Sequence, residues 1–324
     1  MPKVSVIIPV YGAEEYIERC VRSLFEQTLD DLEYLFIDDC TSDKSIEILI
    51  KLLDEYPQRK NQVVIHRMEH NSGQAKVREW GMSNVTGEYV IHCDSDDWVD
   101  KHMYEEMYKK AVEDNADIVV CGYYKSDGFN CESFVVKNIP PNKDIFLREL
   151  LCHTIEPAVW NKLVRSECYK NKISYPVHNM GEDLALMIQI FYFSEKISYI
   201  KKPYYFYYLN TGSITGDCSF ENVVRRVYQL KENVDFIINF LNNQFVGNCY
   251  KRELMHLKFF VKCELCQCSE KGKIGNFGND IYPECSILNI LQLRKISIRA
   301  KLLYVLYRLG VYHFLKNIKR KYKR

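Results

Sequence analysis

Three aspartates follow a short apolar segment in the first third of the chain. Asp94 to Asp97 read Asp-Ser-Asp-Asp and come directly after Val90 to Cys93. Carboxylates this close together repel one another unless a cation joins them. Oxygen ligands suit Mg²⁺ or Mn²⁺, which are usually held by one or two carboxylates together with substrate phosphates. We therefore predict that Asp94 and Asp96 bind a divalent metal that would bridge a diphosphate. The alternative is capping of the next helix, which needs one Asp rather than three.

A second acidic pair lies further along the chain. Glu182 and Asp183 follow Gly181 and open a segment whose apolar residues have helical spacing. Acids in the first turn of a helix are stabilised by the positive end of its dipole. The residues alone therefore leave open whether this pair does more than stabilise a helix start.

The elements that must position these acids alternate between β-branched runs and amphipathic patterns. Such an order predicts an α/β fold with a right-handed, mostly parallel sheet, in which ligands bind beyond the carboxyl ends of the strands. The predicted strands are Val4–Val10, Leu32–Ile37, Val63–Arg67 and Tyr89–Cys93, and the predicted helices are Glu14–Phe25, Ser45–Glu55 and Gln74–Val85.

Each predicted strand is followed by residues suited to ligand binding, which we expect to meet at one edge of the sheet. For Asp38 and Asp39, formation of a turn is an alternative role, and one Asp could serve each purpose. The residues after the four strands are Pro9 and Tyr11, then Asp38 and Asp39, then His70, Asn71 and Gly73, and finally Asp94, Asp96 and Asp97.

Taken in order, these motifs resemble those of family 2 glycosyltransferases, which have the GT-A fold of nucleotide-diphospho-sugar transferases with a Rossmann-like sheet and helices on both faces. The resemblance covers roughly residues 3 to 215. It extends to the bacterial subgroup that builds capsular polysaccharide, exopolysaccharide and O-antigen. The motifs are Val4 to Tyr11, Ile37-Asp38-Asp39, Asn71-Ser72-Gly73, Asp94 to Asp97, Trp160-Asn161-Lys162-Leu163 and Gly181-Glu182-Asp183.

The resemblance implies a site for a nucleotide sugar, most simply a UDP-sugar. Asp39 would accept a hydrogen bond from the uracil N–H. The helix start after Asn71 and Gly73 would face phosphate, and Arg78 would be an anion partner or else a solvated helix charge. The implied donor-binding residues are Pro9, Tyr11, Asp39, Asn71, Gly73, Arg78, Asp94, Ser95 and Asp96.

The resemblance also implies the chemistry. Asp183 would be the catalytic base and Glu182 would orient or bind the acceptor, so that a single in-line displacement inverts the anomeric carbon. The acceptor would be a glycan or a lipid-linked oligosaccharide, and a β-linkage would form from an α-linked donor. Core packing is the alternative for Trp160. The implied acceptor-binding residues are Trp160, Asn161, Lys162 and Asp97.

Some residues depart from the family pattern. Gly12, Cys40 and Glu79 replace the usual Asn, Gly and Asn, which bears on the identity of the donor. Relatives often have a metal-binding His where this chain has Leu209 to Thr211, before a loop with Ser213 and Thr215 that some relatives use against the diphosphate.

Composition sets further limits. The 324 residues, 47% of them hydrophobic, suffice for one large domain or a domain with an appendage. We expect a GT-A domain over residues 1–215, with a nucleotide-sugar half (about 1–120) and an acceptor half (about 121–215), and a helical region over 216–324. No run of about 18 apolar residues occurs, so we expect a cytoplasmic protein. The 13 cysteines are expected to be reduced thiols, because a zinc site at Cys249, Cys263, Cys266 and Cys268 lacks a closing ligand pair.

The C-terminal tail differs from the rest of the chain. Arg294 to Arg324 contains eleven Lys or Arg and no acid, interleaved with apolar residues. Such a segment can lie on an anionic membrane surface, which would make the protein peripheral on the inner face of the cell membrane, or it can pack on the protein's own body. Nucleic-acid binding is disfavoured because the remainder of the chain is acidic and contains no motif of that kind.

Other classes of protein fit less well. A nicotinamide dehydrogenase would need a glycine-rich turn after the first strand, and this chain has only Gly12 there. A sugar nucleotidyltransferase would need a glycine-rich activating loop near the N-terminus. A noncatalytic protein that binds nucleotide sugars or aids assembly would have no use for Asp94, Asp96 and Asp183 together.

Overall fold

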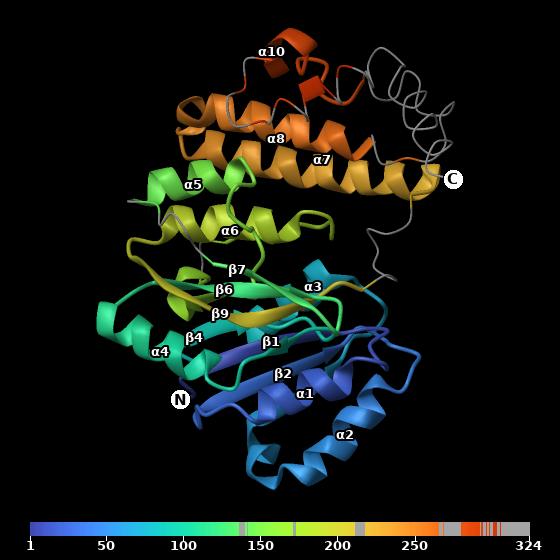
Figure 1. The fold of residues 1–324 in the computed structure, drawn as a ribbon, viewed down its shortest axis with the longest axis vertical. Helices are drawn as coiled ribbons and strands as arrows, with labels where there is room; N and C mark the ends of the chain where they lie inside the picture. The colour runs from blue at the N-terminus through green and yellow to red at the C-terminus, as the bar shows by residue number, and fades with distance from the viewer. Residues whose placement is uncertain are drawn as a thin grey trace. The chain divides into compact units, whose positions relative to one another are not determined.

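The computed structural model describes residues 1–135, 140, 142–170, 173–210, 218–265 and 280–291, with residues 268, 293, 296, 298, 301, 302 and 305. The chain divides into two compact units, residues 1–147 with 157–211 and residues 148–156 with 212–324 (Figure 1). The predicted boundary after residue 215 lies outside the described residues, as do Ser213, Thr215, Cys266 and most of the predicted basic tail.

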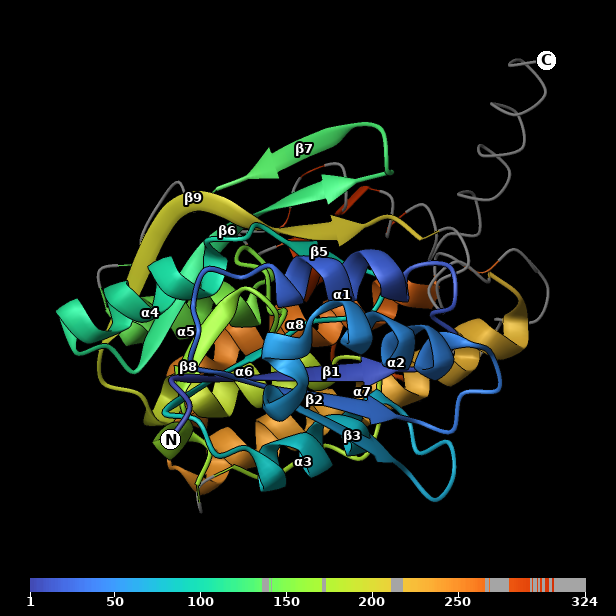
Figure 2. The same cartoon turned by 90° about the horizontal axis from the view of Figure 1, so that it is seen from below.

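The first unit is built on one sheet, whose described strands are ordered β3-β2-β1-β4-β8-β6-β9-β5, with β7 paired to β6 (Figure 2). The first four strands of this order are parallel, as predicted. Strand β8 is antiparallel to both β4 and β6, so the other half of the sheet is mixed. The strands are β1 (Val4–Val10), β2 (Leu32–Asp38), β3 (Val63–Arg67), β4 (Tyr89–His92), β5 (Trp98–Val99), β6 (Ile118–Ser126), β7 (Cys131–Phe134), β8 (Lys162–Arg165) and β9 (Ile197–Tyr208).

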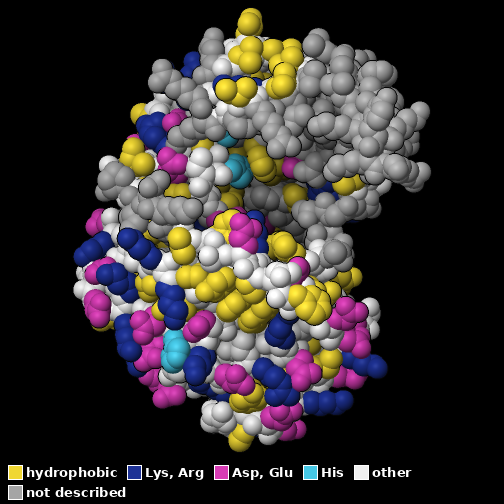
Figure 3. All heavy atoms as spheres, in the orientation of Figure 1, with side chains coloured by type: hydrophobic (Ala, Val, Ile, Leu, Met, Phe, Trp, Pro, Cys, Tyr) yellow, Lys and Arg dark blue, Asp and Glu magenta, His cyan; other side chains and the backbone are white. Residues whose placement is uncertain are grey.

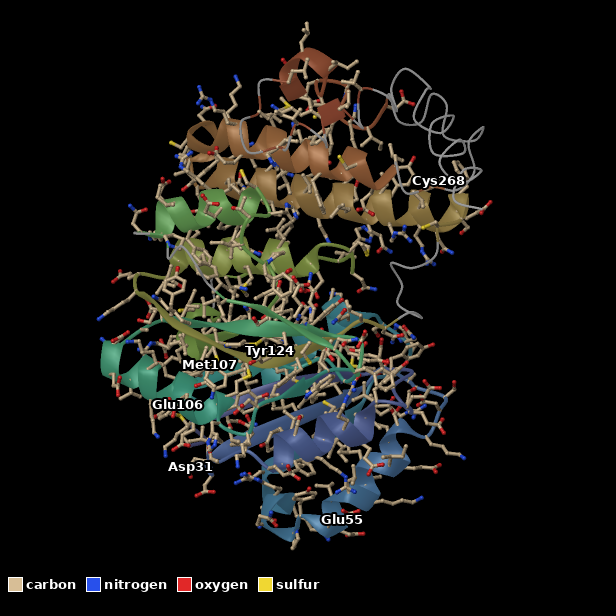
Figure 4. All side chains as sticks on the ribbon, in the orientation of Figure 1. Asp31, Glu55, Glu106, Met107, Tyr124 and Cys268 are labelled. Carbon is tan, nitrogen blue, oxygen red and sulfur yellow. The ribbon has the colours of Figure 1, made fainter. Side chains whose placement is uncertain are left out.

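Helices cover both faces of this sheet, as expected for the fold class. Alternate residues of β1 pack into a core shared with α1 (Ile17–Phe25), α2 (Ser45–Glu55) and α4 (Met103–Asp114). Figure 4 labels Met107 of α4, which is buried in this core, and its exposed neighbour Glu106. On the opposite face, α3 (Gln74–Asn84) packs closely, since a Cβ on Gly81 would lie 2.8 Å from Cγ2 of Ile7.

Other α-helices in the described part of the chain are α5 (Lys143–Leu151), which begins in the first unit and ends in the second, α6 (Glu182–Phe193) in the first unit, and α7 (Phe220–Asn243), α8 (Lys251–Glu264) and α10 (Ile287–Leu291) in the second. Helix α1 begins three residues later than predicted, because Ala13 to Tyr16 form a turn in which the Ala13 carbonyl accepts the Ile17 N–H (2.8 Å). Among the described residues, no helix has the length and apolar character needed to cross a bilayer.

Candidate active site

A buried arginine joins the two acidic motifs. Arg78 of α3 is 1% exposed and pairs with three carboxylates. Its Nη2 lies 2.8 Å from Oδ1 of Asp94, after β4, and its Nη1 lies 2.6 Å from Oδ1 of Asp183, in the first turn of α6. The same Nη1 also pairs with Glu182. We call these four residues the reactive cluster. Arg78 is therefore not a solvated helix charge, so that alternative is wrong.

The reactive cluster has more negative than positive charge. Three carboxylates face one guanidinium, and a low-dielectric surrounding makes such an excess costly. Burial, together with the neighbouring Asp96 and Asp183, raises the pKa of Asp94 to about 6 even though Arg78 opposes the shift. Burial and the charge of Arg78 lower the pKa of His92, at the end of β4, to about 3. The cluster is thus arranged to attract a further positive charge.

The turn that follows β4 is held by β9. Asp97 is fully buried, and its carboxylate accepts hydrogen bonds from the Tyr205 hydroxyl (2.6 Å) and the Tyr208 N–H (2.7 Å). The Tyr205 hydroxyl also accepts the Asp94 N–H (3.1 Å). Both oxygens of Asp97 are therefore used to anchor the turn, and its contact with the acceptor stays a prediction.

An arginine from α1 holds the same turn from the other side. Arg19 donates to the Asp96 carbonyl (2.9 Å), and its guanidinium lies 3.7 Å from the centroid of the Trp98 ring. Burial raises the pKa of Asp96, while a hydrogen bond from the Asn210 side chain acts in the opposite direction. Asn210 is one of the residues found where relatives often have a metal-binding His.

The fit of a divalent metal rests on two carboxylates. Within the described ranges, no group of three or more His, Cys, Asp or Glu side chains is arranged to hold a metal ion. Burial raises the pKa values of Asp94 and Asp96, so their charged forms are disfavoured, and a bound cation would stabilise those charged forms. They fit an ion of the Mg²⁺ or Mn²⁺ type that takes its other ligands from phosphate and water.

The acids after β2 are used within the protein. The two oxygens of Asp39 accept the N–H groups of Ser72 (2.7 Å) and Gly73 (2.9 Å), and Asp39 is 4% exposed. Asp38 accepts the Thr41 N–H (2.7 Å), which is the turn role left open for one of the pair.

The N–H groups at and just before the start of α3 also have partners within the protein. We expected the free N–H groups of α3 to face phosphate, and one of them, that of Ala75, donates to Oδ1 of Asn179 (3.1 Å). Just before the helix, the N–H groups of Ser72 and Gly73 donate to Asp39. Asn71 is exposed beside them. These three N–H groups are therefore used within the protein, and contact of the α3 start with phosphate stays a prediction.

Of the remaining predicted donor residues, Tyr11 and Ser95 lie beyond the ends of strands, whereas Pro9 lies within β1. Tyr11 follows β1 and is 58% exposed, whereas Pro9 is half-buried and pairs in register with Ile37 of β2. Ser95 is 8% exposed in the turn after β4. Their contact with a nucleotide stays a prediction.

The comparison with protein families decides the identity of the chain. The model of the family described as "Glycosyl transferase family 2" matches residues 5–179. The chain belongs to glycosyl transferase family 2. The predicted family, fold class and enzyme class are thereby confirmed, and the protein is a family 2 glycosyltransferase.

Curated relatives are bacterial glycosyltransferases. The chain is 33% identical to glycosyltransferase GlyA of Streptococcus pneumoniae over 227 residues, which cover 66% of this chain and 31% of GlyA. It is 30% identical to EpsH of Bacillus subtilis over 222 residues, which cover 66% of this chain and 62% of EpsH. The chain thus spans less than two thirds of the length of these relatives.

Solved structures share the fold of this family 2 glycosyltransferase. Residues 1–349 of S. aureus TarS superpose with a TM-score of 0.65 at 19% identity, covering 99% of this chain and 91% of that one. The same segment solved with UDP-GlcNAc gives a TM-score of 0.57 at 16% identity, with the same coverage. The mannosyltransferase PcManGT from Pyrobaculum calidifontis, solved with GDP-Man and Mn²⁺, gives 0.59 at 14% identity and covers 98% and 87%.

Three residues predicted to bind the acceptor lie inside this glycosyltransferase. Trp160 is 4% exposed and stacks on Tyr205, with ring centroids 4.3 Å apart. Asn161 donates to the Cys121 carbonyl (3.0 Å), and Nζ of Lys162 donates to the Ala158 carbonyl (2.6 Å) and to Oδ1 of Asn161 (2.7 Å). The core-packing alternative therefore describes Trp160 better, and the polar pair supports the fold.

Sequence reasoning missed the residues that hold the motifs in place. Arg19, Tyr205 and Asn179 each bind a motif backbone or helix start, and each lies far from its partner in the chain. Arg19 and Tyr205 stand within ordinary amphipathic or alternating segments, so no local signal separates them from packing residues. The position of Asn179, two residues before Gly181, was the one available hint.

Proposed function

We propose that this protein is an inverting, metal-assisted hexosyltransferase that moves a sugar from a UDP-sugar to a hydroxyl of a glycan or lipid-linked oligosaccharide in surface-polysaccharide synthesis. The observation that carries the proposal is the reactive cluster, in which Arg78 joins Asp94 to Asp183. A carboxylate for the donor diphosphate and a carboxylate for the acceptor are then adjacent. The structures of TarS with UDP-GlcNAc and of PcManGT with GDP-Man and Mn²⁺ support a nucleotide-sugar donor.

In the proposed reaction Asp183 takes the proton of the acceptor hydroxyl as its oxygen attacks the anomeric carbon. The bond to the diphosphate breaks on the opposite side, so the configuration inverts and no covalent intermediate forms. Arg78 fixes the direction of the Asp183 carboxylate, and Glu182 shares that arginine. A positioned base of this kind typically contributes about 10² to 10⁴-fold in rate.

Asp94 and Asp96 would hold the divalent metal. When bound, Mg²⁺ or Mn²⁺ supplies charge stabilisation for the departing diphosphate. Asp97, Arg19 and Tyr205 keep the turn of these two acids in place. Exposed Tyr11 and half-buried Pro9 would frame the nucleotide base beside Asp39.

The tail is part of the proposal as a membrane contact. Its eleven cations and no acids would favour an anionic bilayer, by about 1 kcal/mol for each cation near the surface. A cytoplasmic enzyme bound at the inner face would meet lipid-linked acceptors there. Figure 3 shows acidic and basic side chains interspersed over α1, α2 and α4, which gives no support to nucleic-acid binding on that face. Deleting Arg294 to Arg324 should weaken sedimentation with anionic liposomes, and unchanged sedimentation would contradict the membrane role.

The test is release of UDP from a panel of UDP-sugars with Mn²⁺, Mg²⁺ or chelator, using wild type and Asp96→Asn. Slow hydrolysis of one donor that requires both the metal and Asp96 is the expected result, and it would name the sugar. Release that is equally fast with chelator would contradict metal assistance. Donor binding without turnover on a broad acceptor panel would favour the noncatalytic alternative.

A further inference from the structure

Asn179 contacts the starts of two helices at once. Its side-chain Oδ1 accepts the Ala75 N–H in the first turn of α3 (3.1 Å). Its backbone carbonyl accepts the Glu182 N–H at the first residue of α6 (3.4 Å). The first N–H groups of a helix have no partner within the helix, so each of these bonds satisfies a donor that would otherwise need water or a cap. One residue therefore ties α3 to α6.

This contact depends on the glycine that precedes α3. A Cβ added to Gly73 would lie 2.5 Å from Nδ2 and 2.7 Å from Oδ1 of Asn179, closer than real Cβ atoms come. Gly73 also has φ +82°, a conformation that side chains disfavour. Its N–H is held by Asp39 (2.9 Å). The chain of contacts thus runs from the β2 end through Gly73 to the loop that carries the second acidic motif.

A second link between the same helices lies one turn further in. Arg78 is three residues after Ala75, and its Nη1 binds Asp183 (2.6 Å) and Glu182 of α6. Residues three apart on a helix lie on the same side. The bond of Asn179 and the ion pairs of Arg78 therefore connect the same sides of α3 and α6 at two levels, which fixes how closely the helices approach.

We propose that Asn179 is a positioning residue: it sets the approach of α3 to α6 so that Arg78 holds the Asp183 carboxylate where the acceptor proton is taken. This role rests on the proposed function, in which Asp183 is the base. Loss of the Asn179 side chain leaves the α3 start uncapped and lets the two helices separate. A misplacement of about 1 Å at a reacting group can cost about a hundredfold in rate.

The kinetic test compares Asn179→Ala with a matched control. Asn142→Ala also removes an asparagine whose Oδ1 accepts a helix N–H, that of Ile145 (3.0 Å), on the unrelated helix α5. We expect Asn179→Ala to lower kcat about tenfold with less than a twofold change in donor KM, and Asn142→Ala to keep kcat within about twofold. Asn179→Asp keeps the acceptor oxygen and should restore most of kcat. Equal kcat in Asn179→Ala and wild type would overturn the proposal, and so would an equal loss in both alanine variants.

A second arm needs no turnover. The unfolding equilibria of Gly73→Ala, Asn179→Ala and the double variant are measured in urea. Because truncating Asn179 removes the clash with the new Cβ, the double variant should be at least about fivefold more stable, as an equilibrium constant, than additivity predicts. Additive losses would overturn the contact itself. If the pair is coupled and Asn179→Ala loses kcat while Asp183→Asn keeps full turnover, Asn179 still positions α3 against α6, but the assignment of Asp183 as the base falls, and with it the part of the proposal that concerns Asp183.

Discussion

Asp43, which follows β2, and Asp94, which follows β4, have the same chemistry but opposite environments. Asp43, in the turn after β2, accepts four hydrogen bonds from Thr41, Ser45 and Glu14. These bonds outweigh its partial burial, so its pKa is lowered. Asp94 accepts one amide hydrogen bond, from Nε2 of Gln74 (3.1 Å), and shares a single arginine with two other acids, and burial raises its pKa to about 6. Carboxylates with their own N–H and O–H donors build the frame, whereas carboxylates that compete for one cation form the reactive cluster.

This difference has a functional meaning. A partly exposed carboxylate with several donors, such as Asp43, is held in its charged form and offers little to a substrate or a metal. Carboxylates that compete for one cation repel one another, and this unfavourable energy is released when a cation binds or when one of them takes up a proton. Sites of this kind trade stability for activity. Substituting Asp43 should therefore lower stability and keep turnover. Substituting an acid of the reactive cluster should keep stability and lower turnover.

The largest expected effect is that of Asp183→Asn. Transfer should fall by about 10² to 10⁴-fold, because the base is lost, while donor binding stays within about twofold. Stability should be unchanged or higher, since one of three competing acids is removed. Asp54→Asn, at an acid 75% exposed and paired with Lys60, is the matched control and should keep full activity. Full turnover in Asp183→Asn would make the division between frame and cluster acids meaningless for catalysis.

The next effect is that of Asp96→Asn on donor binding. We expect affinity for UDP in the presence of Mn²⁺ to fall at least about tenfold, because one of two carboxylate ligands becomes a neutral amide. Affinity measured with chelator should not change. Isothermal titration of UDP with and without Mn²⁺ measures both, and an equal loss under the two conditions would mean that Asp96 contacts the nucleotide without a metal.

The sequence predicted the features of the fold that depend on residues close together in the chain. The alternation up to His92 gave the four parallel strands in the right places, and the edge where Tyr11, Asp39 and Asp94 lie followed from parallel order. It could not distinguish the anchoring role of Asp97 from the metal-binding role predicted for Asp96, because the anchoring partners Tyr205 and Tyr208 lie more than a hundred residues away.

The same limit explains the arginine and the tryptophan. Whether Arg78 is solvated or buried is decided by α6, which begins 104 residues later. Trp160 is a core residue because β9 places Tyr205 against its ring. Strand β9 pairs with β6 in the mixed half of the sheet, which the alternation of strands and helices did not predict. Local patterns specify elements, and the packing of distant elements decides which acid is free to react.

A smaller effect tests whether burial also disfavours the charged form of a titrating side chain in the second unit. His153 stacks on Phe260, with ring centroids 3.9 Å apart, and its Nδ1 is buried without a hydrogen-bond partner among the described residues. Burial and the neighbouring His256 lower its pKa to about 4. A lowered pKa contributes stability above the ordinary His value near 6.5 that is lost as the pH falls toward 4.

His153→Phe keeps a ring on Phe260 and removes the titrating group. The wild type should lose up to about 2 kcal/mol more than this variant between pH 6.5 and 4, less than the full pKa difference implies because part of the ring reaches solvent. Urea unfolding at a series of pH values measures the slopes, which a constant offset from the substitution does not alter. Parallel slopes would show that folding does not change the solvation of His153, so that burial does not lower its pKa.

The smallest effect is that of Asp43→Asn, the reverse of the cluster substitution. The amide keeps one acceptor oxygen but presents a donor to the Glu14 N–H, which now donates to Oδ2 (2.9 Å), so stability at pH 7 should fall by about 1 kcal/mol. Because the pKa of Asp43 is lowered, its stabilisation is present above the ordinary Asp value near 4 and disappears as the pH falls below it. The unfolding curves of the variant and the wild type should therefore converge in acid, while kcat at pH 7 stays within about twofold because Asp43 lies outside the reactive cluster. A variant that kept full stability but lost turnover would place Asp43 among the reactive acids and reverse the comparison.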